Sequence, residues 1–198
     1  MKKYKVIRTT LIKWIIKIIF CITKSLIPVN NRKVIFASCR AESLNGNLLY
    51  VYKEMVSRNL NLKIKLLLRR YKNTLLGKTL YFFNLIISSY HLATARLFII
   101  DDYYFPVYVI KPRKRTEIIQ LWHAAGAFKK FGFSTLGYKD GPSDKYLDEI
   151  KIHSNYSKVY VSSANVIPIY AEAFNMDPTK IIPLGVPRTD YFFELDSH

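Results

Sequence analysis

The sequence predicts an α/β fold, a Rossmann-like parallel sheet with helices on both faces. Three observations support this prediction. Short apolar runs rich in β-branched residues alternate with longer segments of helical period. These runs are apolar on both faces, as in parallel sheets that helices cover on each side. Half of the 198 residues are hydrophobic, enough to bury the core of one domain.

The predicted elements follow one another along the chain after a helix at the amino terminus. The predicted strands cover residues 33–38, 61–68, 96–102, 116–122, 158–163 and 180–185. The predicted helices cover residues 45–59, 75–95, a short segment after Trp122, and residues 143–151 and 164–174. Asn45 or Asn47 is the expected amino-terminal cap of the helix over 45–59, because asparagine accepts hydrogen bonds from free backbone N–H groups.

The basic side chains are concentrated in the first half of the chain. Residues 1–100 hold 19 Lys and Arg against 2 Asp and Glu, whereas residues 101–198 hold 12 of each. The formal net charge of +17 therefore arises wholly in the first half. Such a field attracts polyanions such as anionic lipid, nucleic acid or a phosphate polymer, and charge alone does not choose among them.

Metal and disulfide chemistry have little support in the sequence. Cys21 and Cys39 show no C-x-x-C pair and no metal-ligand spacing, which argues against a disulfide framework. Asp101 and Asp102 end a predicted strand and are oxygen ligands, but no third ligand accompanies them. No metal and no cofactor are assigned.

The first 30 residues are predicted to form a basic amphipathic helix at a membrane surface. Lys13, Lys17 and Lys24 fall within about 40° of one another on a helix, and isoleucines and Trp14 occupy the other faces. No acidic residue occurs before Glu42. The lysines interrupt the apolar run, so a helix in the membrane plane is favoured over a spanning one. Packing of this helix on the body of the protein is the alternative.

The stretch EIIQLWHAAGAFKKFG, residues 117–132, carries the main functional candidate. In open parallel sheets ligands bind at the carboxyl ends of the strands, and His123 directly follows a predicted strand. Gly126 and the alanines before it leave room for an anion at the start of the expected helix, and Lys129 and Lys130 add positive charge. A neutral imidazole there is suited to act as general base for a hydroxyl that attacks phosphorus. The alternative is a histidine at a strand end beside ordinary surface lysines.

The segment QLWHAAGAFKKFG resembles the signature of the CDP-glycerol glycerophosphotransferase family, whose members build the poly(glycerol phosphate) or poly(ribitol phosphate) chains of wall teichoic acids. FASCRAESLNGNLLYVYKEM and VYVSSANVIPIYAEAFNMDPTKIIPLGVPRTDYFF are similar to two further family segments, the second ending in G-x-P-R-x-D. The resemblance covers residues 33–193. Many members have His-Gly-Thr-Pro where this chain has His-Ala-Ala-Gly.

The resemblance implies a GT-B fold, of which residues 31–193 form the Rossmann-like acceptor-side domain. It implies a peripheral protein on the cytoplasmic face of the bacterial membrane. It also implies that His123 removes the proton of the terminal acceptor hydroxyl as that oxygen attacks the β-phosphorus of CDP-glycerol, with CMP leaving. The partners are then CDP-glycerol, a lipid-linked teichoic acid acceptor and an anionic membrane surface. Primases and polymerases are not separated by these motifs, nor are glycerol and ribitol phosphate.

Four further residues are candidate substrate contacts. Arg188 and Asp190 either contact the substrate or form a salt bridge within a structural turn. Asn45 and Asn47 either bind acceptor hydroxyls and phosphates or cap their helix.

The resemblance places the CDP-glycerol pocket in a carboxyl-terminal donor-binding domain that these 198 residues do not include. We therefore expect the sequence to be a fragment or a truncated form, without autonomous catalysis. Two alternatives remain. One is a nucleic-acid-binding module using basic clusters such as Arg113–Arg115, although no RNA- or DNA-binding motif accompanies them and nucleic acid is not the expected partner. The other is a different nucleotide-sugar glycosyltransferase of GT-B architecture.

Overall fold

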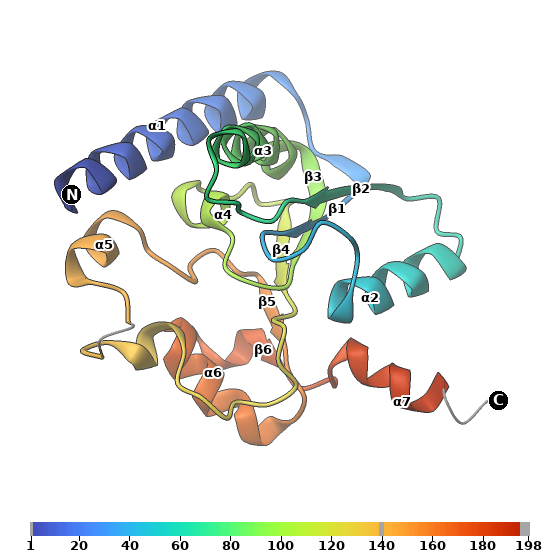
Figure 1. The fold of residues 1–198 in the computed structure, drawn as a ribbon. Coiled ribbons are helices and arrows are strands. Elements are labelled where there is room, and N and C mark those ends of the chain that lie inside the picture. Colours follow the sequence, from blue (N-terminus) through green and yellow to red (C-terminus); the bar gives the residue numbers. More distant parts are fainter. Residues whose placement is uncertain (1, 139–140, 195–198) are drawn as a thin grey trace.

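The six strands form one sheet in which every neighbouring pair is parallel (Figure 1). The computed structural model describes residues 2–138 and 141–194. Across the sheet the strands lie in the order β2-β1-β3-β4-β5-β6. Their bounds are β1 (Asn30–Ser38), β2 (Lys63–Leu68), β3 (Ala95–Ile100), β4 (Glu117–Gln120), β5 (Lys158–Tyr160) and β6 (Ile181–Ile182). The predicted Rossmann-like parallel sheet is confirmed.

One face of the sheet is covered by several helices and holds the larger core. These are α1 (Lys2–Leu26), α3 (Leu75–Thr94), α4 (Phe105–Val109) and α6 (Ile167–Phe174). Ile35, Phe98 and Ile118 project from three adjacent strands into this core and are fully buried. Alternate residues of the central strands thus face these helices, as the period of two along a strand requires.

The opposite face is covered mainly by α2 (Gly46–Ser57), beside the 3-10 helix η4 (Pro187–Asp190). Phe36, Leu48 and Ile99 form the centre of this smaller core. Beyond α2 the face is less completely covered. An open pocket of about 710 Å³ lies there between α2, the segment 184–190 and the sheet.

The part of the chain after β4 is rich in short elements. They are η1 (Gly132–Thr135), α5 (Asp144–Glu149), η2 (Ala164–Val166), η3 (Pro178–Lys180) and α7 (Tyr191–Glu194). An aromatic cluster holds this part together: the Trp122 ring stacks on Phe131 with centroids 5.2 Å apart, and His153 stacks on Phe174 at 4.4 Å. Burial lowers the pKa of His153 to about 3, so this histidine is a neutral core residue.

The amino-terminal helix α1 packs on the body of the protein and still leaves apolar residues exposed. Ile16 and Phe20 are buried in the larger core, and Ser89 of α3 donates its hydroxyl to the Ile16 carbonyl. Trp14 and Ile18 are each more than half exposed on the outer side. Lys13 does not face outward, because its ammonium binds the side chain and carbonyl of Glu149. Among residues 2–138 and 141–194, no helix has the length and apolarity that crossing a membrane requires.

The sequence predictions fail at two places in the fold. The short helix expected directly after Trp122 is wrong: residues 123–131 form no helix, and the first helical turn begins at Gly132. Helix α4, with Pro106 at its start, was not predicted. Its five residues are all buried, so tertiary packing rather than helical period determines it.

Candidate functional site

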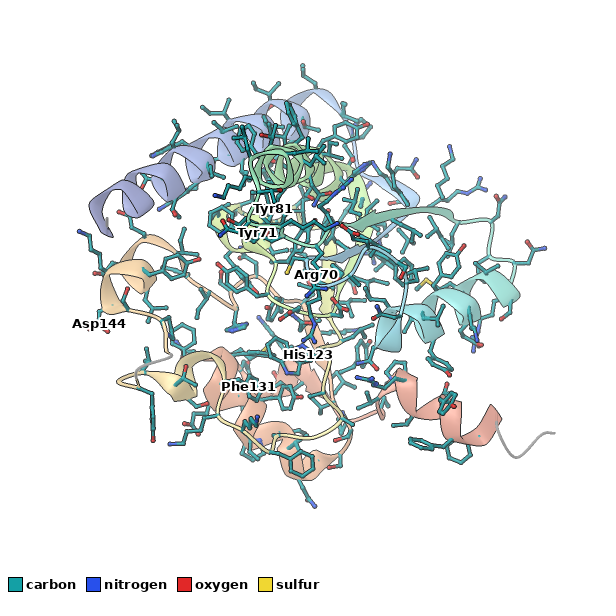
Figure 2. All side chains as sticks on the ribbon, viewed as in Figure 1. Arg70, Tyr71, Tyr81, His123, Phe131 and Asp144 are labelled. Atoms are coloured by element: carbon teal, nitrogen blue, oxygen red, sulfur yellow. The ribbon has the colours of Figure 1, made fainter. Side chains whose placement is uncertain are left out.

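The strand order creates a crevice at the carboxyl ends of β1 and β3. The chain leaves β1 towards β2 on one side and leaves β3 towards β4 on the other, which makes this point a topological switch. Asp101 and Asp102 follow β3, and Trp122 and His123 follow β4. In Figure 2, His123 lies near the middle of the molecule, between Arg70, which follows β2, and Phe131. His123 is therefore at the sheet edge where the sequence predicted it.

A strained turn presents His123 at this edge. Trp122 has a left-handed backbone with φ of +53°, which costs about 1–2 kcal/mol for a residue other than glycine. Its side chain is buried in the aromatic cluster and its ring lies 4.6 Å from that of His123. The turn thus directs the tryptophan into the core and leaves the next residue at the surface.

Two buried carboxamides hold the turn in place. Gln120 accepts the Trp122 N–H at 2.8 Å and donates to the carbonyl of Asp102 at 3.0 Å. Asn47 donates to the Trp122 carbonyl at 2.8 Å and to the Leu121 carbonyl at 3.2 Å. These bonds satisfy backbone groups that the end of β4 leaves unpaired, and such groups are costly when buried.

The imidazole of His123 is partly buried, with one nitrogen turned towards the end of β3. Its Nδ1 lies 3.3 Å from the carbonyl oxygen of Asp101 and 3.8 Å from Oδ1 of Asp102. A carbonyl oxygen only accepts hydrogen bonds, so this contact requires the proton on Nδ1 and leaves the lone pair on Nε2. The side chain is 32% exposed.

Burial and neighbouring charges act on His123 in opposite directions. Burial is the main cause that lowers its pKa below the ordinary histidine value, and the positive charges of Arg40 and Arg188 add to this effect. The Asp102 carboxylate counteracts it. The result is a neutral imidazole at neutral pH, the form in which histidine accepts a proton.

Two guanidinium groups flank the histidine. Arg188 donates from Nη1 to the carbonyl of His123 at 2.7 Å, and its backbone N–H donates to Asn47 at 3.0 Å. The Nε of Arg40 lies 3.6 Å from Oδ2 of Asp102. Both residues are exposed and retain N–H groups that can bind an anion near the histidine. The site thus combines a neutral imidazole with two nearby cations, a combination suited to phosphoryl transfer.

Asp101 is a second unusual group at this edge. It is only 6% exposed, and its Oδ1 has no hydrogen-bond partner among the described residues. Burial raises its pKa to about 6, while the Ser38 hydroxyl has the opposite effect. Among the residues that the structure describes, no group of three His, Cys, Asp or Glu side chains is placed to hold a metal ion.

The predicted asparagines have different roles from those expected. Asn47 is 2% exposed, and its carboxamide is engaged by three backbone groups, so its assignment as a substrate contact is wrong. Asn45 is the cap residue of α2, but its side chain forms no capping hydrogen bond. Asn45 is exposed, unlike the buried Asn47.

The loop after His123 also differs from the prediction. Because residues 123–131 form no helix, no helix start lies beside Gly126 to bind an anion. The ring of Phe128 covers Gly126, where an added Cβ would lie 2.8 Å from it. Lys129 and Lys130 are exposed, and Lys130 donates to the Tyr138 hydroxyl at 3.0 Å.

Of the turn GVPRTD, Arg188 lies beside His123, and the internal salt bridge that was one of the two alternatives is not formed among the described residues. Arg188 forms no ion pair with Asp190 in the described part of the chain, and its guanidinium is bound to His123 instead. Asp190 is exposed and lines the open pocket beside α2. Sequence reasoning missed Arg40 and Gln120 entirely, and the only available signal was their position at the ends of predicted strands.

A parallel sheet with a half-buried histidine and two arginines at its switch point is typical of Rossmann-like domains that bind anionic ligands. Comparison with known proteins identifies the family. The sequence profile of the CDP-glycerol:poly(glycerophosphate) glycerophosphotransferases matches residues 19–198. The chain belongs to this family, as its motifs suggested.

Several curated relatives act in teichoic acid synthesis. A teichoic acid ribitol-phosphate primase of Bacillus spizizenii is 44% identical over 96% of this chain and 48% of its own length. The ribitol-phosphate polymerase TarL of Staphylococcus aureus is 36% identical over 98% of this chain and 34% of its own. A glycerol-phosphate primase of Bacillus subtilis is 29% identical over 56% of this chain. The chain therefore spans about half, or less, of the length of these relatives.

Solved structures agree on the fold. The wall teichoic acid polymerase TagF superposes with a TM-score of 0.66 at 14% identity, covering 98% of this chain and 48% of TagF. This similarity confirms the predicted fold class, a Rossmann-like α/β fold like that of TagF.

Proposed function

We propose that this chain forms the acceptor-side half of a teichoic acid polyol-phosphate transferase in which His123 is the general base. The observation that carries the proposal is the orientation of the imidazole. Nδ1 faces the Asp101 carbonyl, so this contact leaves the lone pair of Nε2 available, and the charges of Arg40 and Arg188 act on the same ring.

The proposed step moves one proton and exchanges one phosphorus–oxygen bond. The terminal hydroxyl oxygen of the acceptor attacks the phosphorus that carries the polyol in a CDP-polyol, while Nε2 of His123 takes the hydroxyl proton. The bond from that phosphorus to the bridging oxygen breaks, and CMP leaves with the electron pair. Arg40 and Arg188 stabilise the charge on the non-bridging oxygens, which is the main contribution a protein makes to this reaction.

We propose ribitol phosphate rather than glycerol phosphate as the transferred unit. The relatives that are 36–44% identical have names that specify ribitol phosphate, and those named for glycerol phosphate are 26–29% identical. The family resemblance of the motifs alone implies CDP-glycerol, so a direct competition of CDP-ribitol against CDP-glycerol for transfer distinguishes the two donors. Because the chain spans half of the primase length, we expect the donor's cytidine to be bound by residues other than these 198.

We propose that the exposed side of α1 rests on the cytoplasmic face of the membrane, where the lipid-linked acceptor is anchored. Its apolar residues are spaced three or four apart, and each is more than half exposed. They are Leu11, Trp14, Ile18, Ile22 and Leu26. Lys17 lies over the Trp14 ring at 5.2 Å, and Lys24 is exposed. Apolar side chains flanked by lysines are typical of helices that bind anionic membrane surfaces.

Calorimetric titration of the chain with ribitol-phosphate oligomers tests the proposed acceptor site. We expect binding that weakens as salt rises, because several phosphates contact cationic groups. Arg188→Gln and Arg40→Gln should each weaken binding about 10-fold, the effect of a lost charge-assisted hydrogen bond of about 1.4 kcal/mol. Lys158→Gln is the matched control, since Lys158 is exposed at the amino end of β5, on the opposite edge of the sheet. Equal loss in all three variants, or no binding by the unaltered chain, would contradict the proposal.

A further inference from the structure

The Asp102 carboxylate lies close to the inner nitrogen of His123. Its Oδ1 lies 3.8 Å from Nδ1, on the same side as the Asp101 carbonyl. We propose that Asp102 is the positioning residue of His123: together with the Asp101 carbonyl it keeps the proton on Nδ1, so that Nε2 faces the substrate as the base. This proposal deepens the proposed function and rests on it.

The carboxylate of Asp102 is itself held in place. Its Oδ1 accepts the backbone N–H of Tyr103 at 2.7 Å, and its Oδ2 lies 3.6 Å from Nε of Arg40. The side chain is only 20% exposed. A carboxylate fixed at both oxygens cannot swing away from the imidazole without breaking these contacts, which is the property a positioning group requires.

The backbone that carries Asp102 is tied to the backbone that carries the histidine. Gln120, which is fully buried, donates to the Asp102 carbonyl at 3.0 Å and accepts the Trp122 N–H at 2.8 Å. One side chain therefore links the end of β3 to the residue that precedes His123. This link fixes the distance between the carboxylate and the imidazole, although the two residues are 21 positions apart in the sequence.

The charge of Asp102 opposes the other charges that face His123. Arg40, after β1, and Arg188, of η4, both disfavour a proton on the ring, as does burial. Asp102 is the carboxylate that favours it. When Nε2 takes the acceptor proton the ring becomes a cation that the charges of two guanidinium groups disfavour, and the carboxylate stabilises that cation. Asp102 thus makes a half-buried imidazole beside two arginines usable as a base.

Nitrogen NMR of the ring tests this role in the chain itself, without any catalytic turnover. Long-range ¹H–¹⁵N correlation spectra of the ¹⁵N-labelled chain, recorded from about pH 4 to pH 9, report the protonation of each imidazole nitrogen. His123→Gln assigns the signals. In the unaltered chain we expect the neutral ring to carry its proton on Nδ1. A neutral ring protonated on Nε2 would overturn the proposal without the need for any Asp102 variant.

Asp102→Asn keeps the size of the side chain and removes its charge. We expect the pKa of His123 to fall, and a substantial fraction of the neutral ring to carry its proton on Nε2. Asp148→Asn, on the exposed side of α5, removes the same charge at a place away from the histidine. It should leave the pKa and the tautomer of His123 unchanged. If Asp102→Asn retains the backbone spectrum of the fold yet leaves the tautomer and the pKa as they were, the positioning role is refuted. Oligomer binding by the unaltered chain is measured separately, so a failure of the proposed function can be distinguished from a failure of the positioning role.

Discussion

Replacement of Asn47 by alanine should destabilise the protein strongly, although Asn47 lies in the polar stretch SLNGN, where the sequence indicates a surface position. The carboxamide of Asn47 binds three backbone groups: the carbonyls of Leu121 and Trp122 and the N–H of Arg188. These contacts join α2 to the end of β4 and to η4. Their loss would leave the strained Trp122 turn without one of its two supports.

The expected cost follows from the number and burial of these bonds. A typical intramolecular hydrogen bond contributes about 1 kcal/mol, and leaving its partner buried and unpaired costs about 1–3 kcal/mol. Asn47 is 2% exposed, so water does not replace it readily. Alanine regains about 0.6 kcal/mol of helix propensity at this position. We therefore expect Asn47→Ala to lower the free energy of unfolding by about 2–4 kcal/mol.

Urea denaturation followed by circular dichroism measures this cost. Asn45→Ala is a matched control, because the Asn45 side chain is exposed and forms no capping bond, and it should change the free energy of unfolding by less than about 0.5 kcal/mol. If the two variants lose equal stability, the claim that Asn47 supports the Trp122–His123 turn is wrong.

Three further predictions concern pH and the membrane. The pKa of Asp101 is raised to about 6 from an ordinary 3.8, so the wild type should lose about 3 kcal/mol of stability as pH rises from about 4 to 7. Urea denaturation of Asp101→Asn should not show this loss; the same pH dependence in both proteins would contradict the prediction. The pKa of His153 is lowered to about 3, so the folded state loses stability as pH falls below about 6.5, because the unfolded chain then binds a proton. His153→Phe should reduce this dependence of the free energy of unfolding on pH. An unchanged dependence would show that the buried ring is not responsible. Trp14→Ser with Ile18→Ser should reduce co-sedimentation with anionic vesicles several-fold. Leu184→Ser should not, although Leu184 is more exposed than either residue, because it lies on another part of the molecule; equal losses would refute the role of α1.

The sheet and the place of His123 were predictable because their signals are local. Each strand is a short apolar run, and a residue that directly follows a parallel strand must lie at the carboxyl edge of the sheet. The alternation of strands and helices also predicts a parallel sheet with a topological switch point. None of this required knowledge of contacts between distant residues.

The partners of His123 were not predictable, because they come from distant parts of the chain. Asn47 and Arg188 are 141 positions apart and meet only through the folded sheet. Asn47 lies in a helix whose period indicates nothing about a hydrogen bond to a strand end. In the sequence, Gln120 is one polar residue in an apolar strand, which does not indicate a role at the turn. Its two hydrogen bonds there depend on the left-handed backbone of Trp122.

The failed helix after Trp122 has a physical cause that the local pattern does not contain. Phe131 turns inward to stack on Trp122 and to contact Tyr170 and Phe174. Gly132 then takes a positive φ against the carbonyl of Ala173, where any Cβ would collide. Burial of Phe131 thus outweighs the weak helical preference of residues 123–131.

Acylation of the histidines by diethyl pyrocarbonate, resolved by peptide mass spectrometry, tests the central claim most directly. The reagent attacks an accessible unprotonated imidazole nitrogen, so His123 should react far faster than the buried His91 and His153. Ribitol-phosphate oligomers should then slow its modification. A His123 that stays unmodified, or that reacts at the same rate with and without the oligomer, would contradict an open base at the acceptor site.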